Sequence, residues 1–126
     1  MKRVVGIGGV FFKAKNPEKL RDWYRDHLGF NVDNWGGVVF QPSGKGDPET
    51  EQTVWSLFPE DSNHFSPSTQ PFMINYRVDD LLGLIAQLRS EGCNVEAKVD
   101  ESEYGKFGWV LDPEGNRVEL WEPPKS

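Results

Sequence analysis

One carboxylate within an apolar segment is the clearest candidate for chemistry in this chain. Glu119 lies between Val118 and Leu120, in a stretch whose alternation of residue types predicts a half-buried strand. Because alternate strand residues face opposite sides, the two apolar neighbours are expected to pack beneath a helix while Glu119 faces a cavity. A carboxylate in that position can orient a ligand or act as a general base.

Further polar side chains are expected on the same face. Lys13 or Arg77 could pair with a carboxylate of a ligand, and Asn75 could hydrogen-bond a carbonyl, which predicts an anionic or carbonyl-bearing ligand. Glu119 itself is expected to have Arg117, Arg77 or Lys13 as a partner. In the alternative, Arg117 or Arg77 pairs with Glu119 and the side chains fill a closed barrel that binds nothing. The predicted ligand-binding residues are Phe11, Lys13, Ser56, Asn75, Arg77, Trp109, Arg117 and Trp121.

Aromatic residues add to the predicted pocket. Trp35, Trp109 and Trp121 are candidates for stacking on a flat ligand, whereas Trp23 is assigned to the core of a helix. The segment 101–109 places two glycines among large aromatic residues, so it is either a loop that closes over a ligand or an ordinary hairpin.

Two similar units position these residues. In each, a strand leads into a helix and then into short strands, and neither unit alone could bury its apolar face. In the first unit, Asn16 and Pro17 begin the helix and Gly29 ends it. In the second, Asp79 or Asp80 caps a helix that runs through Glu91. The predicted strands are 5–14, 30–32, 38–41, 53–57, 72–78, 95–99, 107–111 and 117–121.

The motifs of both units resemble a known family. Asp112-Pro113-Glu114-Gly115-Asn116, with Val118-Glu119-Leu120 after it, is similar to the glyoxalase, bleomycin-resistance and extradiol-dioxygenase superfamily, whose members are also called vicinal oxygen chelate proteins. Residues 23–30 and 76–80 support the resemblance. It implies one α+β domain over 1–126, with unit one at about 4–58, a linker at 59–71 and unit two at 72–123. The units would form a curled mixed sheet around a cavity, with both helices on its outer face.

In this family, metal ligands normally lie on the inward faces of four strands. The corresponding residues here are Gly9, Ser56, Met73 and Glu119, and only Glu119 is of a ligand type. A catalytic Zn, Ni or Fe site needs three or four protein ligands. No metal and no other cofactor is therefore predicted. His64 lies in the linker, where it is either solvated or, if the linker folds over the cavity mouth, a group that titrates near neutral pH.

Three functions follow from different classes. The first is a small-molecule binding protein with a degenerate metal site, as the resemblance to bleomycin-resistance proteins implies. The second is a metal-independent lyase, isomerase or epimerase with Glu119 as general base, and the third is a metal-dependent glyoxalase or dioxygenase. The missing ligands at Gly9 and Met73 make the third the weakest.

Composition limits the partners. The net charge of −6 disfavours nucleic acid, and no stretch is long and apolar enough for a membrane span, so a cytoplasmic protein is predicted. The lone Cys93 excludes an intrachain disulfide. The resemblance implies a homodimer, and strand 5–14 and the last strand are expected to border the twofold contact.

Overall fold

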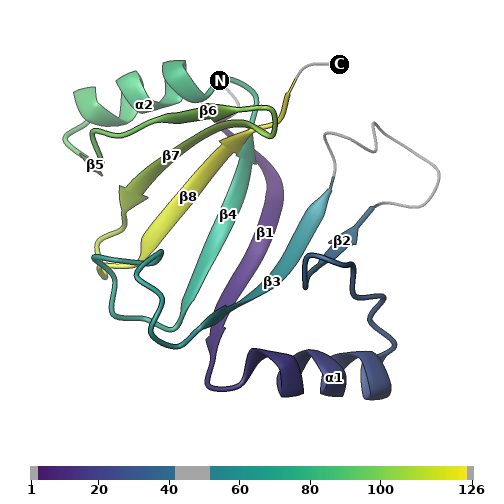
Figure 1. Cartoon of the computed structure of the whole chain (residues 1–126). Coiled ribbons are helices and arrows are strands. Elements are labelled where there is room, and N and C mark those ends of the chain that lie inside the picture. Colours follow the sequence, from purple (N-terminus) through teal and green to yellow (C-terminus); the bar gives the residue numbers. More distant parts are fainter. Residues whose placement is uncertain (1–2, 42–51, 125–126) are drawn as a thin grey trace.

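The computed structural model describes residues 3–41 and 52–124 (Figure 1). These described residues form two helices and eight strands in the order β-α-β-β, then β-α-β-β-β-β. The elements are β1 (Val4–Ala14), α1 (Pro17–Leu28), β2 (Val38–Phe40), β3 (Thr53–Pro59), β4 (Phe72–Val78), α2 (Leu81–Ser90), β5 (Asn94–Val95), β6 (Asp100–Ser102), β7 (Gly105–Leu111) and β8 (Arg117–Glu122).

The strands form one mixed sheet, which confirms the predicted α+β class. Its order is β2-β3-β1-β4-β8-β7-β5, with β6 paired to β7, and the path is open. The two units meet where β1 pairs antiparallel with β4. Within the first unit β1 pairs with β3 in parallel, and within the second β4 pairs with β8 in parallel. Both β1 and β8 are interior strands of this sheet, and their place at a twofold contact stays a prediction.

Local signals set the bounds of α1. The Asn16 side chain accepts a hydrogen bond from the backbone N–H of Lys19, and Gly29 adopts a left-handed conformation at the C-terminal end. Leu20 and Tyr24 pack against the outer face of β1 and β3. Trp23, however, is 49% exposed, so its assignment to the helix core is wrong.

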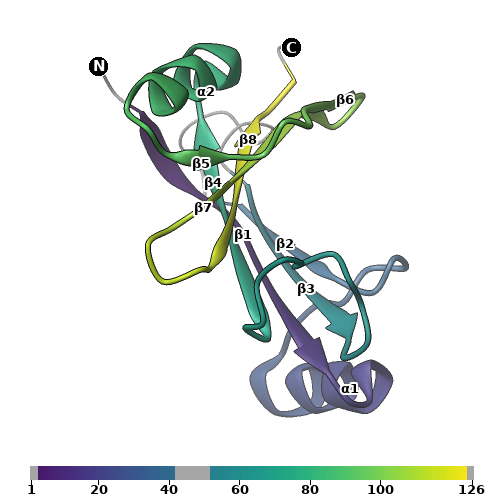
Figure 2. The ribbon, with the colours of Figure 1, turned by 90° about the vertical axis from the view of Figure 1, so that its left-hand side faces the viewer.

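Helix α2 is fixed to the sheet at its first turn. Asp80 caps the helix through the backbone N–H of Gly83, and the Glu122 carboxylate accepts the N–H of Leu81 at 2.9 Å. Negative charge at this end also suits the helix dipole. Leu81, Leu84 and Ile85 pack with Val78 and Leu120 in a buried cluster on the outer face. The helices lie at opposite ends of the molecule (Figures 1 and 2).

The structure differs from the prediction in three strands. Residues 30–32 form no strand; Phe30 and Val32 instead pack on the cluster beneath α1. Of the predicted strand 95–99, only Val95 lies in a strand, β5, which pairs with β7. Strand β6 was not predicted, and it pairs with β7 so that segment 101–109 is a hairpin. Its turn requires Gly105, whose φ of 115° is unfavourable for other residues.

The turn between β7 and β8 is organised by its first residue. The Asp112 carboxylate accepts hydrogen bonds from the backbone N–H groups of Glu114 and Asn116 and from the Asn116 side chain. These bonds, above all the one from the Asn116 side chain, lower the pKa of Asp112. The motif that carries the family resemblance is thus a self-contained turn.

The linker folds over the concave face of the sheet. It contains no strand between β3 and β4, as predicted, and in Figure 1 it runs between the ends of those two strands. Phe65 from this segment is fully buried in a cluster with Met73 and Trp109. Part of the concave face is therefore filled by the chain's own side chains.

Candidate functional site

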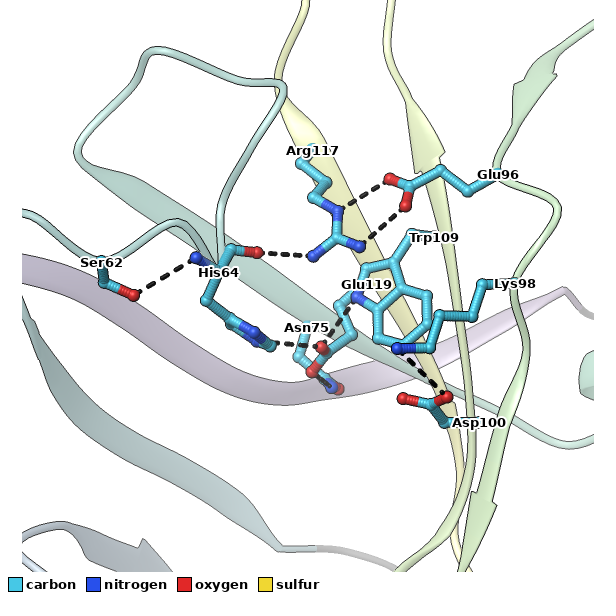
Figure 3. A network of polar contacts seen from close by, with 9 residues as sticks. All are labelled: Ser62, His64, Asn75, Glu96, Lys98, Asp100, Trp109, Arg117 and Glu119. Atoms are coloured by element: carbon cyan, nitrogen blue, oxygen red, sulfur yellow. Dashed lines mark hydrogen bonds and ion pairs between the residues drawn. The ribbon is translucent and has the colours of Figure 1, made fainter.

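Glu119 is the centre of a buried polar network on the concave face (Figure 3). Its side chain accepts a hydrogen bond from Asn75 Nδ2 at 2.6 Å on Oε1 and from Trp109 Nε1 at 2.9 Å on Oε2. Strand register brings the three together, because Glu119 lies opposite Asn75 on β4 and opposite Trp109 on β7. Both oxygens are thus held in one orientation, as a preorganised site requires.

The linker adds an imidazole to this network. His64 Nε2 lies 3.6 Å from Glu119 Oε2, and its ring stacks on Phe58 with a centroid distance of 5.1 Å. The backbone N–H of His64 donates to Ser62 Oγ. The linker therefore brings His64 to Glu119, but the imidazole stays 40% exposed and does not line the pocket described below.

The predicted cationic partners of Glu119 make other contacts. Arg117 forms a two-bond ion pair with Glu96, at 2.7 and 2.8 Å, and its guanidinium lies over the Trp109 ring. Arg77 donates to the backbone oxygen of Gln52, and Lys13 lies over the Phe65 ring. The expected pairing of Arg117, Arg77 or Lys13 with Glu119 is therefore wrong.

An open pocket of about 660 Å³ lies beside Glu119 on the concave face. Of the predicted residues, Phe11, Trp35, Asn75, Glu119 and Trp121 line it. The others named in the sequence analysis, Lys13, Ser56, Arg77, Trp109 and Arg117, do not. The other lining residues are Gly8, Val39, Gln52, Val54 and Pro124, together with Glu103, Tyr104 and Phe107 from the segment 101–109 that was expected either to close over a ligand or to form a hairpin. Strand alternation in β2 and β7 could have identified Val39 and Phe107, but no sequence signal selects Glu103.

A bulge in β1 changes which glycine faces this pocket. The pairing with β4 shifts register between Ile7 and Gly9, so Gly8 joins the concave face. A Cβ on Gly8 would overlap Asn75 Oδ1 and would lie 2.8 Å from a ring carbon of Trp121. The absence of a side chain at Gly8 thus makes room for the Asn75 amide. Regular alternation of side chains along β1 predicted Gly9 on the inward face and did not identify Gly8.

The side chains present do not fit the metal that the family implies. Met73 is fully buried against Phe65 and Trp109, and Ser56 lies outside the pocket. Within residues 3–41 and 52–124, no cluster of three or more histidine, cysteine, aspartate or glutamate side chains could hold a metal ion. Glu119 and His64 together supply two donor groups, fewer than a transition-metal site requires.

We expect the purified protein to contain no stoichiometric transition metal, because Gly9, Ser56 and Met73 provide no ligand of the required type. Elemental analysis after dialysis tests this. Copurification of one equivalent of Zn, Ni, Fe or Mn that is lost in Glu119→Gln would contradict it.

Comparisons with known proteins agree with this fold. The sequence model of the Glyoxalase/Bleomycin resistance protein/Dioxygenase superfamily matches residues 6–120. No curated protein sequence matches the chain significantly. Among the helices that the structure describes, none is long and apolar enough to cross a membrane.

Three solved structures illustrate the similarity. Methylmalonyl-CoA epimerase from Mycobacterium tuberculosis has 19% identity and a TM-score of 0.65, over 99% of this chain and 92% of that one. A Streptomyces coelicolor methylmalonyl-CoA epimerase variant in complex with 2-nitronate-propionyl-CoA has 16% identity and a TM-score of 0.70, over 97% and 99%. A superfamily member from Vibrio splendidus 12B01 has 14% identity and a TM-score of 0.62, over 92% and 97%. At such low identities these similarities establish the fold alone.

Proposed function

This chain belongs to the glyoxalase, bleomycin resistance protein and dioxygenase superfamily, and we propose that it binds a small organic molecule in the pocket on its concave face. The observation that carries the proposal is the open pocket with Glu119 and Asn75 in its wall. Its volume of about 660 Å³ is in the range of small-molecule sites. Aromatic walls with few, fixed polar groups are also typical of such sites.

The geometry supports binding more directly than metal chemistry. Glu119 lines the pocket, and its carboxylate is held in one orientation by two hydrogen-bond donors of the protein. The metal-dependent alternative lacks ligands at the positions discussed above. A binding protein needs only the pocket and its preformed polar contacts.

We expect a thermal-shift screen over metals, thiols, keto acids and aromatic drugs to find a stabilising ligand among the organic compounds. A ligand at 100 times its Kd stabilises the folded state by about 2.7 kcal/mol. Trp35→Ala should weaken the effect, because Trp35 lines the pocket. Trp23→Ala is the matched control, since Trp23 is 49% exposed, compared with 55% for Trp35, and lies on α1 away from this pocket. Equal losses in both variants would contradict binding in this pocket.

A second candidate is a metal-independent epimerase or isomerase with Glu119 as general base. Two observations favour it: Glu119 lines the pocket with His64 beside it, and methylmalonyl-CoA epimerases share the fold. Incubation with acyl-CoA thioesters in deuterated water, followed by mass spectrometry, tests it. Deuterium incorporation that is lost in Glu119→Gln would favour this candidate over simple binding.

The homodimer and the cytoplasmic location stay predictions. The described sheet ends at β2 on one side and at β5 on the other, so either edge offers unpaired backbone groups to a second copy. Sedimentation equilibrium at micromolar concentration distinguishes a dimer from a monomer of 14.4 kDa.

A further inference from the structure

The charged side chains that the structure describes in the pocket wall are all acidic. Among the described lining residues, Glu103 and Glu119 carry carboxylates, and no lysine, arginine or histidine is present. The nearby basic groups lie outside this wall: Arg117 pairs with Glu96, Arg77 donates to the backbone oxygen of Gln52, and the His64 imidazole lies 3.6 Å from Glu119 without lining the pocket. Among the described residues, a negative ligand would therefore meet two carboxylates and no cationic side chain in the pocket wall, which is unfavourable at low dielectric.

The Asn75 side chain independently favours a ligand that donates a hydrogen bond. Its Nδ2 donates to Glu119 Oε1, and this bond fixes the orientation of the amide, because a carboxylate oxygen accepts but does not donate. Asn75 is 3% exposed and lines the pocket, and its Oδ1 has no hydrogen-bond partner. Buried acceptors are normally satisfied. An N–H donor from a ligand at the floor of the pocket, above Gly8, would satisfy this oxygen.

The aromatic walls suit a cation with an apolar body. Phe107 and Trp121 stack, with ring planes 12° apart, and Trp121 Nε1 donates to the backbone oxygen of Tyr104, which fixes the indole. Phe11 and Trp35 line the pocket as well. Aromatic faces attract an organic cation through their quadrupoles, in addition to the apolar area that they offer.

Resting on the proposed binding function, we propose that the ligand is an aromatic organic cation with at least one N–H donor, such as a protonated amine or an amidinium. Its charge lies between Glu119 and Glu103, its N–H reaches Asn75 Oδ1, and its ring lies against Trp121 and Trp35. The sequence predicted an anionic or carbonyl-bearing ligand, and the structure favours a cation that donates a hydrogen bond. The reason is that Lys13 and Arg77 lie outside the pocket and that the unpartnered atom of Asn75 is its acceptor, Oδ1.

Four probes of similar shape test this by titration calorimetry and tryptophan fluorescence. They are 2-naphthylmethylammonium, its N-trimethyl derivative, 2-naphthalenemethanol and 2-naphthoate. We expect the ammonium to bind at least tenfold more tightly than the alcohol and the naphthoate to bind most weakly. The trimethyl derivative keeps the charge but lacks the N–H, so it should bind more weakly than the primary ammonium.

Two glutamates of the same hairpin provide matched variants. Glu103→Gln should lower the affinity for the ammonium severalfold and leave the affinity for the alcohol unchanged, because Glu103 lines the pocket. Glu101→Gln removes the same charge from an exposed residue outside that pocket and should change neither affinity.

Glu119→Gln should lower ammonium affinity about tenfold or more. A thermal melt first confirms that this variant is folded, and the Glu103 and Glu101 pair gives a result in either case.

The possible failures are distinguishable. Binding of naphthoate as tight as that of the ammonium, or equal losses in Glu103→Gln and Glu101→Gln, would overturn the cationic ligand class while leaving a ligand pocket. Binding of none of the four probes would overturn the ligand class, and failure of the thermal-shift screen as well would overturn the proposed function itself.

Discussion

Replacing Phe65 with alanine is expected to lower the free energy of unfolding by about 3–5 kcal/mol. Phe65 is fully buried, and its ring packs against Phe58 with a centroid distance of 5.1 Å. It also contacts the buried Met73 and Trp109, so its removal leaves a cavity between the linker and the sheet. Urea denaturation followed by tryptophan fluorescence measures the loss.

Phe72→Ala is the control for this variant. Phe72 is 39% exposed at the start of β4, so the same truncation should cost about 1 kcal/mol or less. Equal losses in the two variants would show that the linker does not pack on the sheet in solution. That result would also remove His64 from the neighbourhood of Glu119.

Leu81→Ala is expected to cost about 2–5 kcal/mol, because Leu81 is fully buried between α2 and the sheet. The backbone N–H of Leu81 keeps its bond to Glu122 in the variant, so the measurement reports the loss of packing.

Leu82→Ala provides a control in the adjacent residue. Leu82 is 48% exposed, and alanine is a good helix former, so this change should cost less than about 1 kcal/mol. Chemical denaturation of both variants tests the orientation of α2. A larger loss in Leu82→Ala would mean that the helix presents its other face to the sheet.

The sequence determined the elements whose causes are local. Asn16 and Asp80 cap the helices because their side chains reach backbone N–H groups within one turn. Alternation correctly placed Asn75 and Glu119 on the concave face, because no bulge interrupts their strands. The turn at Asp112 is also closed by its own hydrogen bonds. Together with the family motifs, these features predicted the fold class.

The partners of Glu119 and the shape of the pocket were decided by tertiary structure. The bulge beside Gly8 shifts alternation within β1, and nothing in a glycine-rich segment indicates where the register changes. The ladder between β5 and β7 ends at Val95, and the next residue, Glu96, forms an ion pair with Arg117. Phe65 and His64 lie over the sheet because the linker buries an aromatic residue there. Local patterns set which face a side chain occupies, but contacts between residues distant in sequence depend on packing of the whole chain.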